Sequence, residues 1–122
     1  MNSKVEMILR ILLGIALVAF GADKFFHYMG MPAPEPGSFM AALGATGYMF
    51  KLIGISELIP GLLLISNKYK GLALVWLVPI SVNIIAFHLN YDMSTIAPAA
   101  FVAILNAVLI YMNWDRFKGL FS

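Results

Sequence analysis

The sequence predicts an all-α protein, a bundle of four transmembrane helices. Four long apolar stretches fill most of its 122 residues: Val5–Gly21, Phe50–Ile65, Leu72–Phe87 and Ile96–Met112. With a few flanking residues, each reaches the roughly 20 residues that a helix needs to cross a bilayer. Hydrophobic residues make up 61% of the chain and charged residues 11%, whereas about 25% charged residues is usual in soluble domains. These features together predict a protein dissolved in lipid.

Composition also excludes several kinds of site. The mean hydropathy is +0.89, and the short chain predicts a single domain over residues 1–122. The absence of cysteine excludes thiol–disulfide chemistry, cysteine zinc sites, and cysteine-bound iron–sulfur clusters or haem. The net charge of +2 is small and the basic residues are scattered, so no nucleic-acid-binding surface is expected.

The first helix is expected from about Val5 to Phe26. Its apolar run is longer than a usual signal-peptide core and contains Arg10, so we expect a retained helix, with cleavage as the alternative. Aromatic residues from Phe25 to Tyr28 follow, and such residues favour the depth of the lipid headgroups.

The next segment predicts a loop and a short helix. Met31–Gly37 has proline at every second position, which favours extended backbone. Ser38 is a suitable N-cap for a short helix over Phe39–Ala45. We expect this helix to lie at the membrane interface or to cover the bundle as a lid.

Three further helices complete the bundle. They are expected at about Tyr48–Ser66, Leu72–Leu89 and Thr95–Trp114, joined by short polar turns. Pro60 and Pro79 lie inside two of them, and membrane helices tolerate internal proline as a kink.

Basic residues favour one side of the membrane. Five of them fall at the two termini and the second interhelical turn: Lys4, Lys68, Lys70, Arg116 and Lys118. Because an excess of lysine and arginine marks the cytoplasmic side, both termini are expected inside and the proline-rich loop outside.

Three of the predicted helices carry a stripe of small and polar residues with alternating steps of four and three. The stripes are Arg10, Gly14, Leu17, Gly21, Lys24; Phe50, Gly54, Glu57, Gly61, Leu64; and Ala99, Ala103, Asn106, Ile110, Asn113. This spacing keeps one face toward a neighbouring helix, and small residues allow backbones to approach closely. We therefore expect the polar members of these stripes to point inward.

Glu57 is the most informative of these residues because it falls near the middle of its helix. An isolated carboxylate at that depth protonates unless a cation or strong donors hold it ionised. The functional interpretation is a proton-relay or ligand-binding group, and the structural interpretation is an ion pair with Arg10. Arg10 also has Glu6 one turn away, or can extend toward the headgroups.

Four more residues complete the candidate ligand-binding set of Arg10, Lys24, Glu57, Asn83, His88 and Asn106. Asn83 and Asn106 predict interhelical hydrogen bonds or a pocket lining. Lys24 and His88 fall near the outer boundary, where each is an interface anchor or a ligand contact. The spacing of the two histidines predicts no metal or haem site, and no catalytic residue can be named.

The order of these residues resembles that of the DoxX-like integral membrane proteins. The resemblance rests on Arg10–Gly14, Phe20–Phe25, Gly54–Gly61 and Asn83–His88, together with the proline-rich first loop. Pro60 stands where many relatives have a small residue. Arg10, Lys24, Glu57 and His88 match polar positions of the family.

The resemblance implies a small four-helix protein of the bacterial inner membrane. Some relatives are linked to a thiosulfate:quinone oxidoreductase, and others to redox complexes that handle sulfur and oxidative stress. The first hypothesis is an accessory subunit that binds an apolar ligand such as a quinone inside the bundle, with redox proteins as partners. The alternative is a non-enzymatic assembly factor or small permease with a structural polar seam, and a homo-oligomeric channel is a third idea.

Overall fold

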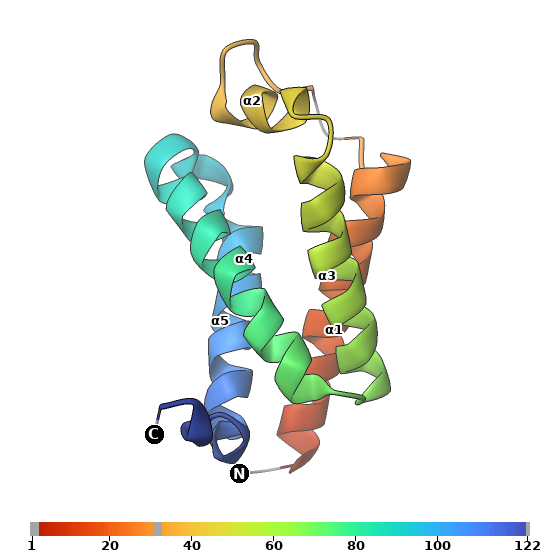
Figure 1. Ribbon diagram of the computed structural model, residues 1–122, viewed down its shortest axis with the longest axis vertical. Coiled ribbons are helices and arrows are strands. Elements are labelled where there is room, and N and C mark those ends of the chain that lie inside the picture. Colours follow the sequence, from red (N-terminus) through yellow and green to blue (C-terminus); the bar gives the residue numbers. More distant parts are fainter. Residues whose placement is uncertain (1–2, 31–32, 122) are drawn as a thin grey trace.

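A computed structural model describes residues 3–30 and 33–121 as four long helices with a short one across one end (Figure 1). Residues 31 and 32, part of the predicted proline-rich loop, lie outside this described portion. The α-helices are α1 (Ser3–Phe26), α2 (Phe39–Ala45), α3 (Met49–Ser66), α4 (Lys70–Tyr91) and α5 (Ile96–Met112). A single 3-10 turn at Met93–Thr95 lies between α4 and α5, and two more, Trp114–Arg116 and Lys118–Phe121, come after α5.

The predicted fold class is confirmed, because the protein is an all-α four-helix bundle. The four long helices are each long and apolar enough to cross a membrane. The predicted bounds of α2 are those observed, and the long helices differ from prediction by one to two residues at most ends. Pro60 and Pro79 lie inside α3 and α4 as predicted.

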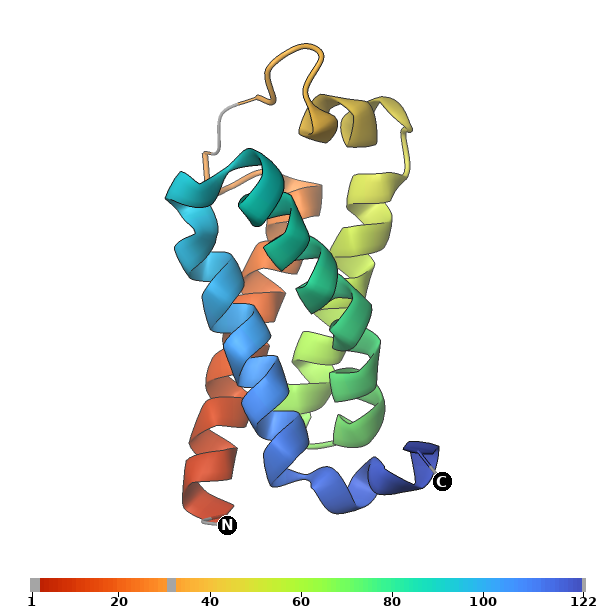
Figure 2. The ribbon, with the colours of Figure 1, turned by 90° about the vertical axis from the view of Figure 1, so that its left-hand side faces the viewer.

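The long helices pack in a ring, in which α1 contacts α3 and α5, and α4 contacts α3 and α5. The contact between α1 and α3 is the most extensive. Figures 1 and 2 show both termini and the α3–α4 turn at one end, and α2 with the α4–α5 turn at the other. We call these the terminal end and the α2 end.

Leucine side chains fill the centre of the bundle. The core includes Leu13 and Leu17 of α1, Leu64 of α3, Leu77 of α4 and Leu109 of α5. Many large apolar side chains remain exposed on the outside, such as Ile15, Leu62, Val82 and Ile104. In a bilayer these residues contact lipid, so their exposure fits a membrane-spanning bundle.

The short helix α2 closes over the α2 end. The Ser38 hydroxyl accepts a hydrogen bond from the Ala41 backbone N–H at 3.1 Å, which confirms the predicted N-cap. The Phe39 ring stacks on Tyr91 with centroids 5.4 Å apart and lies 5.7 Å from Phe87. These contacts join α2 to the end of α4, as expected for a lid.

Candidate functional site

The α1–α3 contact is built around two pairs of glycines. A Cβ atom added to Gly14 would lie 2.9 Å from the Gly61 carbonyl oxygen, and one on Gly21 would lie 2.8 Å from that of Gly54. A Cβ atom on Gly61 would lie 2.9 Å from the Gly14 carbonyl oxygen, and one on Gly54 would lie 3.1 Å from that of Gly21, so a side chain at these positions requires the helices to shift. The stripes predicted for α1 and α3 therefore face each other, which confirms them as interior.

A buried ion pair lies beside the second glycine pair. Lys24 Nζ is 2.5 Å from Glu57 Oε1, and the Glu57 side chain is 8% exposed whereas that of Lys24 is 25% exposed. The pairing of Glu57 with Arg10 was therefore the wrong prediction.

The geometry of α1 explains the correct partner. The glycine contacts place Glu57 level with Val18, so Lys24 is about 9 Å and Arg10 about 12 Å away along the axis. Side chains on a helix tilt toward its N-terminus. This tilt directs Lys24 toward Glu57 and directs Arg10 away from it.

Glu57 Oε1 is incompletely satisfied despite this ion pair. It is the one buried side-chain polar atom in the described portion of the chain for which no hydrogen bond of acceptable geometry is found. The Lys24 ammonium is its charged partner, and the contact is an ion pair. A carboxylate with so few donors is costly in a low-dielectric environment.

Arg10 belongs to a separate polar network at the terminal end. Its Nε lies 3.4 Å from Glu6 Oε1, and its guanidinium donates to the Leu64 carbonyl of α3. The other Glu6 oxygen accepts from Lys70 Nζ at 2.9 Å and from the Asn113 amide at 3.0 Å. The Glu6 carboxylate thereby joins α1 to the start of α4 and the end of α5, and Arg10 joins α1 to α3.

Asn106 makes a third polar contact, between α4 and α5. Its amide oxygen accepts from the Ser81 hydroxyl at 2.9 Å, and its amide nitrogen donates to the Leu74 carbonyl at 3.1 Å. Both side chains are buried. The predicted inward orientation of Asn106 is confirmed, and Ser81 was not predicted.

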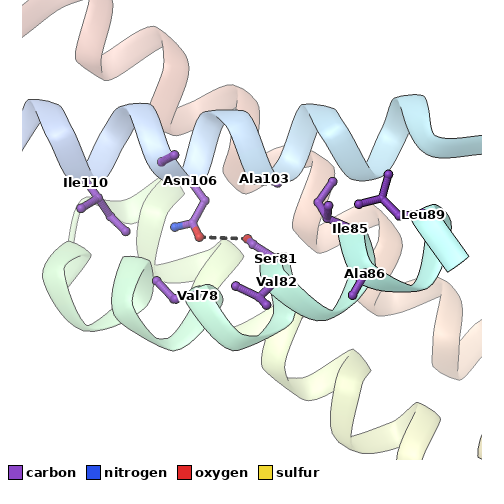
Figure 3. Close-up of a pocket in the computed structure, with 10 residues that line it drawn as sticks. Val78, Ser81, Val82, Ile85, Ala86, Leu89, Ala103, Asn106 and Ile110 are labelled. Carbon is purple, nitrogen blue, oxygen red and sulfur yellow. Dashed lines mark hydrogen bonds between the residues drawn. The ribbon is translucent and has the colours of Figure 1, made fainter.

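This hydrogen bond forms part of the floor of an open groove between α4 and α5 (Figure 3). The groove has a volume of about 640 Å³. Apart from Ser81 and Asn106, its lining is apolar: Val78, Val82, Ile85, Ala86, Leu89, Ala103, Ala107 and Ile110. The surface of the groove is therefore mostly apolar, and the Ser81–Asn106 pair is its polar part.

Asn83 and His88 lie elsewhere on α4. Asn83 is exposed and donates to the Pro79 carbonyl of its own helix at 2.7 Å, so the prediction that it lines an interior pocket with Arg10 and Glu57 was wrong. His88 lies at the α2 end, with its Nδ1 2.9 Å from the Asp92 carbonyl oxygen and its ring edge against Phe87.

The six candidate residues are therefore not brought together. Lys24 and Glu57 form one pair, Arg10 belongs to the terminal network, and Asn106 alone of the six lines the groove. Sequence reasoning missed Ser81 and the joint role of Glu6, Lys70 and Asn113. The available signal was the position of Glu6 one turn before Arg10, with basic and amide residues at the ends of α4 and α5.

The chain matches the DoxX family model over residues 5–90. No curated protein and no solved structure matches it. The matched segment includes α1 to α4 up to Asn90, and hence the glycine pairs, the Lys24–Glu57 pair and His88. The chain belongs to the DoxX family, and it is a multi-pass membrane protein.

Proposed function

We propose that this member of the DoxX family is a non-catalytic accessory subunit of a membrane redox complex, linked to quinone or sulfur chemistry, and that it binds an apolar ligand. The observation that carries this proposal is the groove of about 640 Å³ between α4 and α5. Its volume falls in the usual range for small-molecule sites, which are mostly apolar with a few placed polar groups. Electrons would come from a partner protein.

A quinone fits the chemistry of this groove. Its prenyl tail would lie along the apolar walls, and its head group would compete for the Ser81 hydroxyl and the Asn106 amide at the floor. None of Lys24, Glu57 and His88 lines the groove. They therefore stay predictions, as groups that exchange a proton or contact a ligand that extends beyond the groove. We place the protein in a bacterial inner membrane with both termini in the cytoplasm.

The test is photolabelling of purified protein in lipid nanodiscs with a diazirine-tagged quinone that has a prenyl tail. We expect adducts on peptides that contain residues 78–89 and 103–110. Ala107→Trp fills the groove from an exposed position and is expected to abolish this labelling. Ala97→Trp is the matched control, because Ala97 is exposed on the same helix and outside the groove. Equal labelling of both variants would refute the proposal.

The second candidate is a non-enzymatic assembly factor or small permease whose polar groups only hold the bundle together. It is favoured by the pairing of Glu6 and Glu57 with basic side chains. The double variant Lys24→Met/Glu57→Met removes one pair without leaving a buried charge. Normal quinone-coupled activity of membranes that carry this variant would favour the structural interpretation, and lost activity at unchanged protein level would favour a role for Glu57.

A further inference from the structure

The outward face of α4 carries two asparagines, Asn83 and Asn90, in a mostly apolar row. Successive steps of four and three connect six residues, which we call the α4 stripe: Leu72, Trp76, Pro79, Asn83, Ala86 and Asn90. Leu72, Pro79, Asn83, Ala86 and Asn90 are exposed and Trp76 is half-buried. The buried residues of α4, which include Leu77 and Ser81, lie on the opposite side. The α4 stripe therefore faces away from the core, with Ala86 also at the edge of the α4–α5 groove.

Asn83 places an incompletely paired amide on this stripe at membrane depth. It lies eight residues before the end of α4 at Tyr91, or about 12 Å along the axis. One amide N–H is donated to the Pro79 carbonyl. Within residues 3–30 and 33–121, no partner is found for the amide oxygen. Asn90, one heptad later, has the same arrangement with the Ala86 carbonyl at 2.7 Å.

We infer that the α4 stripe is a homodimer contact, in which Asn83 and Asn90 of one copy pair with the same residues of a second copy. Asparagine has a donor and an acceptor, so its side chain is complementary to itself. The five basic residues on the terminal side predict one insertion orientation for every copy of this chain. Two α4 helices related by a two-fold axis along the membrane normal are therefore parallel, and residues of equal number face each other.

The rest of the stripe suits such a contact. Asn83 and Asn90 are separated by seven residues, so both fall on the same line of a helix pair. Ala86 lies between them and is small enough for the helices to approach closely. The amide pairs would fix register and orientation, as polar seam residues do in coiled coils. A lipid-only environment would leave the Asn83 amide oxygen without a donor.

Disulfide trapping tests the contact directly, because the chain has no cysteine of its own. Ala86→Cys places a thiol on the stripe, and Ile104→Cys is the matched control at an exposed position on α5. Both variants are oxidised with copper phenanthroline in native membranes. We expect a covalent dimer with Ala86→Cys and only a background amount with Ile104→Cys.

A second variant links the dimer to the amide. Adding Asn83→Leu to Ala86→Cys is expected to suppress the covalent dimer, and Asn83→Leu alone to lower the association constant in detergent by about tenfold, the effect of an interhelical amide pair. Helical content and elution as a single species establish that each variant is folded.

Four results would overturn the inference in folded protein, three of them from the variants above. These three are no dimer with Ala86→Cys, equal dimer with Ile104→Cys, or a dimer unchanged by Asn83→Leu. A covalent product with a different protein at residue 86 would also overturn it, since the stripe would then bind another partner.

Discussion

The α1–α3 pair and the α4–α5 pair are both antiparallel transmembrane helix pairs, but they are held together by different means. Between α1 and α3 the backbones touch at two glycine pairs, and a buried ion pair lies beside them. Between α4 and α5 the interior polar contact is the Ser81–Asn106 hydrogen bond, and an open groove lies above it. One pair is therefore tightly packed along its length, while the other leaves an open, mostly apolar groove.

The largest expected loss of stability comes from a change in the α1–α3 pair. Lys24→Met leaves the Glu57 carboxylate buried without its cation. Because removal of one partner of a buried pair is strongly destabilising, we expect a loss of about 3 kcal/mol in the free energy of unfolding. This is the low end for such pairs, since the Lys24 side chain is partly exposed. Reversible unfolding in mixed micelles measures the loss, and Lys24→Met/Glu57→Met is expected to recover most of it.

Substitution of a glycine in the α1–α3 contact should reduce the stability nearly as much. Gly21→Ala adds a methyl group 2.8 Å from the backbone atoms of α3, and we expect it to cost about 1–3 kcal/mol by overpacking. Gly71→Ala is the control, because its Cβ would come no closer than 3.8 Å to any neighbour. Equal stability of the two variants in the same unfolding assay would contradict the backbone contact.

The α4–α5 pair should lose less stability when its polar contact is removed. Asn106→Leu removes the bonds to Ser81 and to the Leu74 carbonyl while keeping a similar volume. Interhelical hydrogen bonds in membranes contribute about 1 kcal/mol or less each, so for these two bonds we expect a loss of about 1–2 kcal/mol. A loss larger than that of Lys24→Met would reverse the contrast between the two pairs.

The smallest effect is expected at the turn between α4 and α5. Hydrogen bonds from the Thr95 and Ser94 hydroxyls lower the pKa of the exposed Asp92 carboxyl from its ordinary value of 3.8. A lowered folded-state pKa contributes stability above the unfolded pKa, and this contribution is lost as the pH falls through the folded pKa. Asp92→Asn should therefore be slightly less stable than the parent near neutral pH. In unfolding measurements the difference should begin to shrink near pH 3.8 and vanish once the pH is below the lowered folded-state pKa.

The comparison also separates what the sequence could predict from what it could not. The positions of the helices and the interior faces of α1, α3 and α5 follow from hydrophobic length and from stripes of small residues, since both patterns are local. The partner of Glu57 depends on the axial offset between α1 and α3 and on the tilt of side chains. That offset is set by the Gly14–Gly61 and Gly21–Gly54 contacts, which no pattern within one helix reveals.

Asn83 and Asn106 illustrate the same limit. Both are single asparagines in apolar helices, and both were predicted to point inward. Asn106 belongs to an interior stripe with Ala99 and Ala103, whereas Asn83 belongs to a stripe that faces outward. Regular spacing of small and polar residues along one helix face therefore does not show whether that face points into the bundle or away from it.

The carboxylate of Glu6 makes the two ends of the bundle mechanically unequal. It connects three helices at the terminal end through Arg10, Lys70 and Asn113, whereas the contacts of Phe39 with α4 at the α2 end are aromatic and undirected. Rings slide over one another far more easily than charged groups separate in a medium of low dielectric constant. We therefore expect α4 and α5 to move together as a rigid pair that pivots about the terminal end. The largest displacement is then expected at the α2 end, where α2 lies.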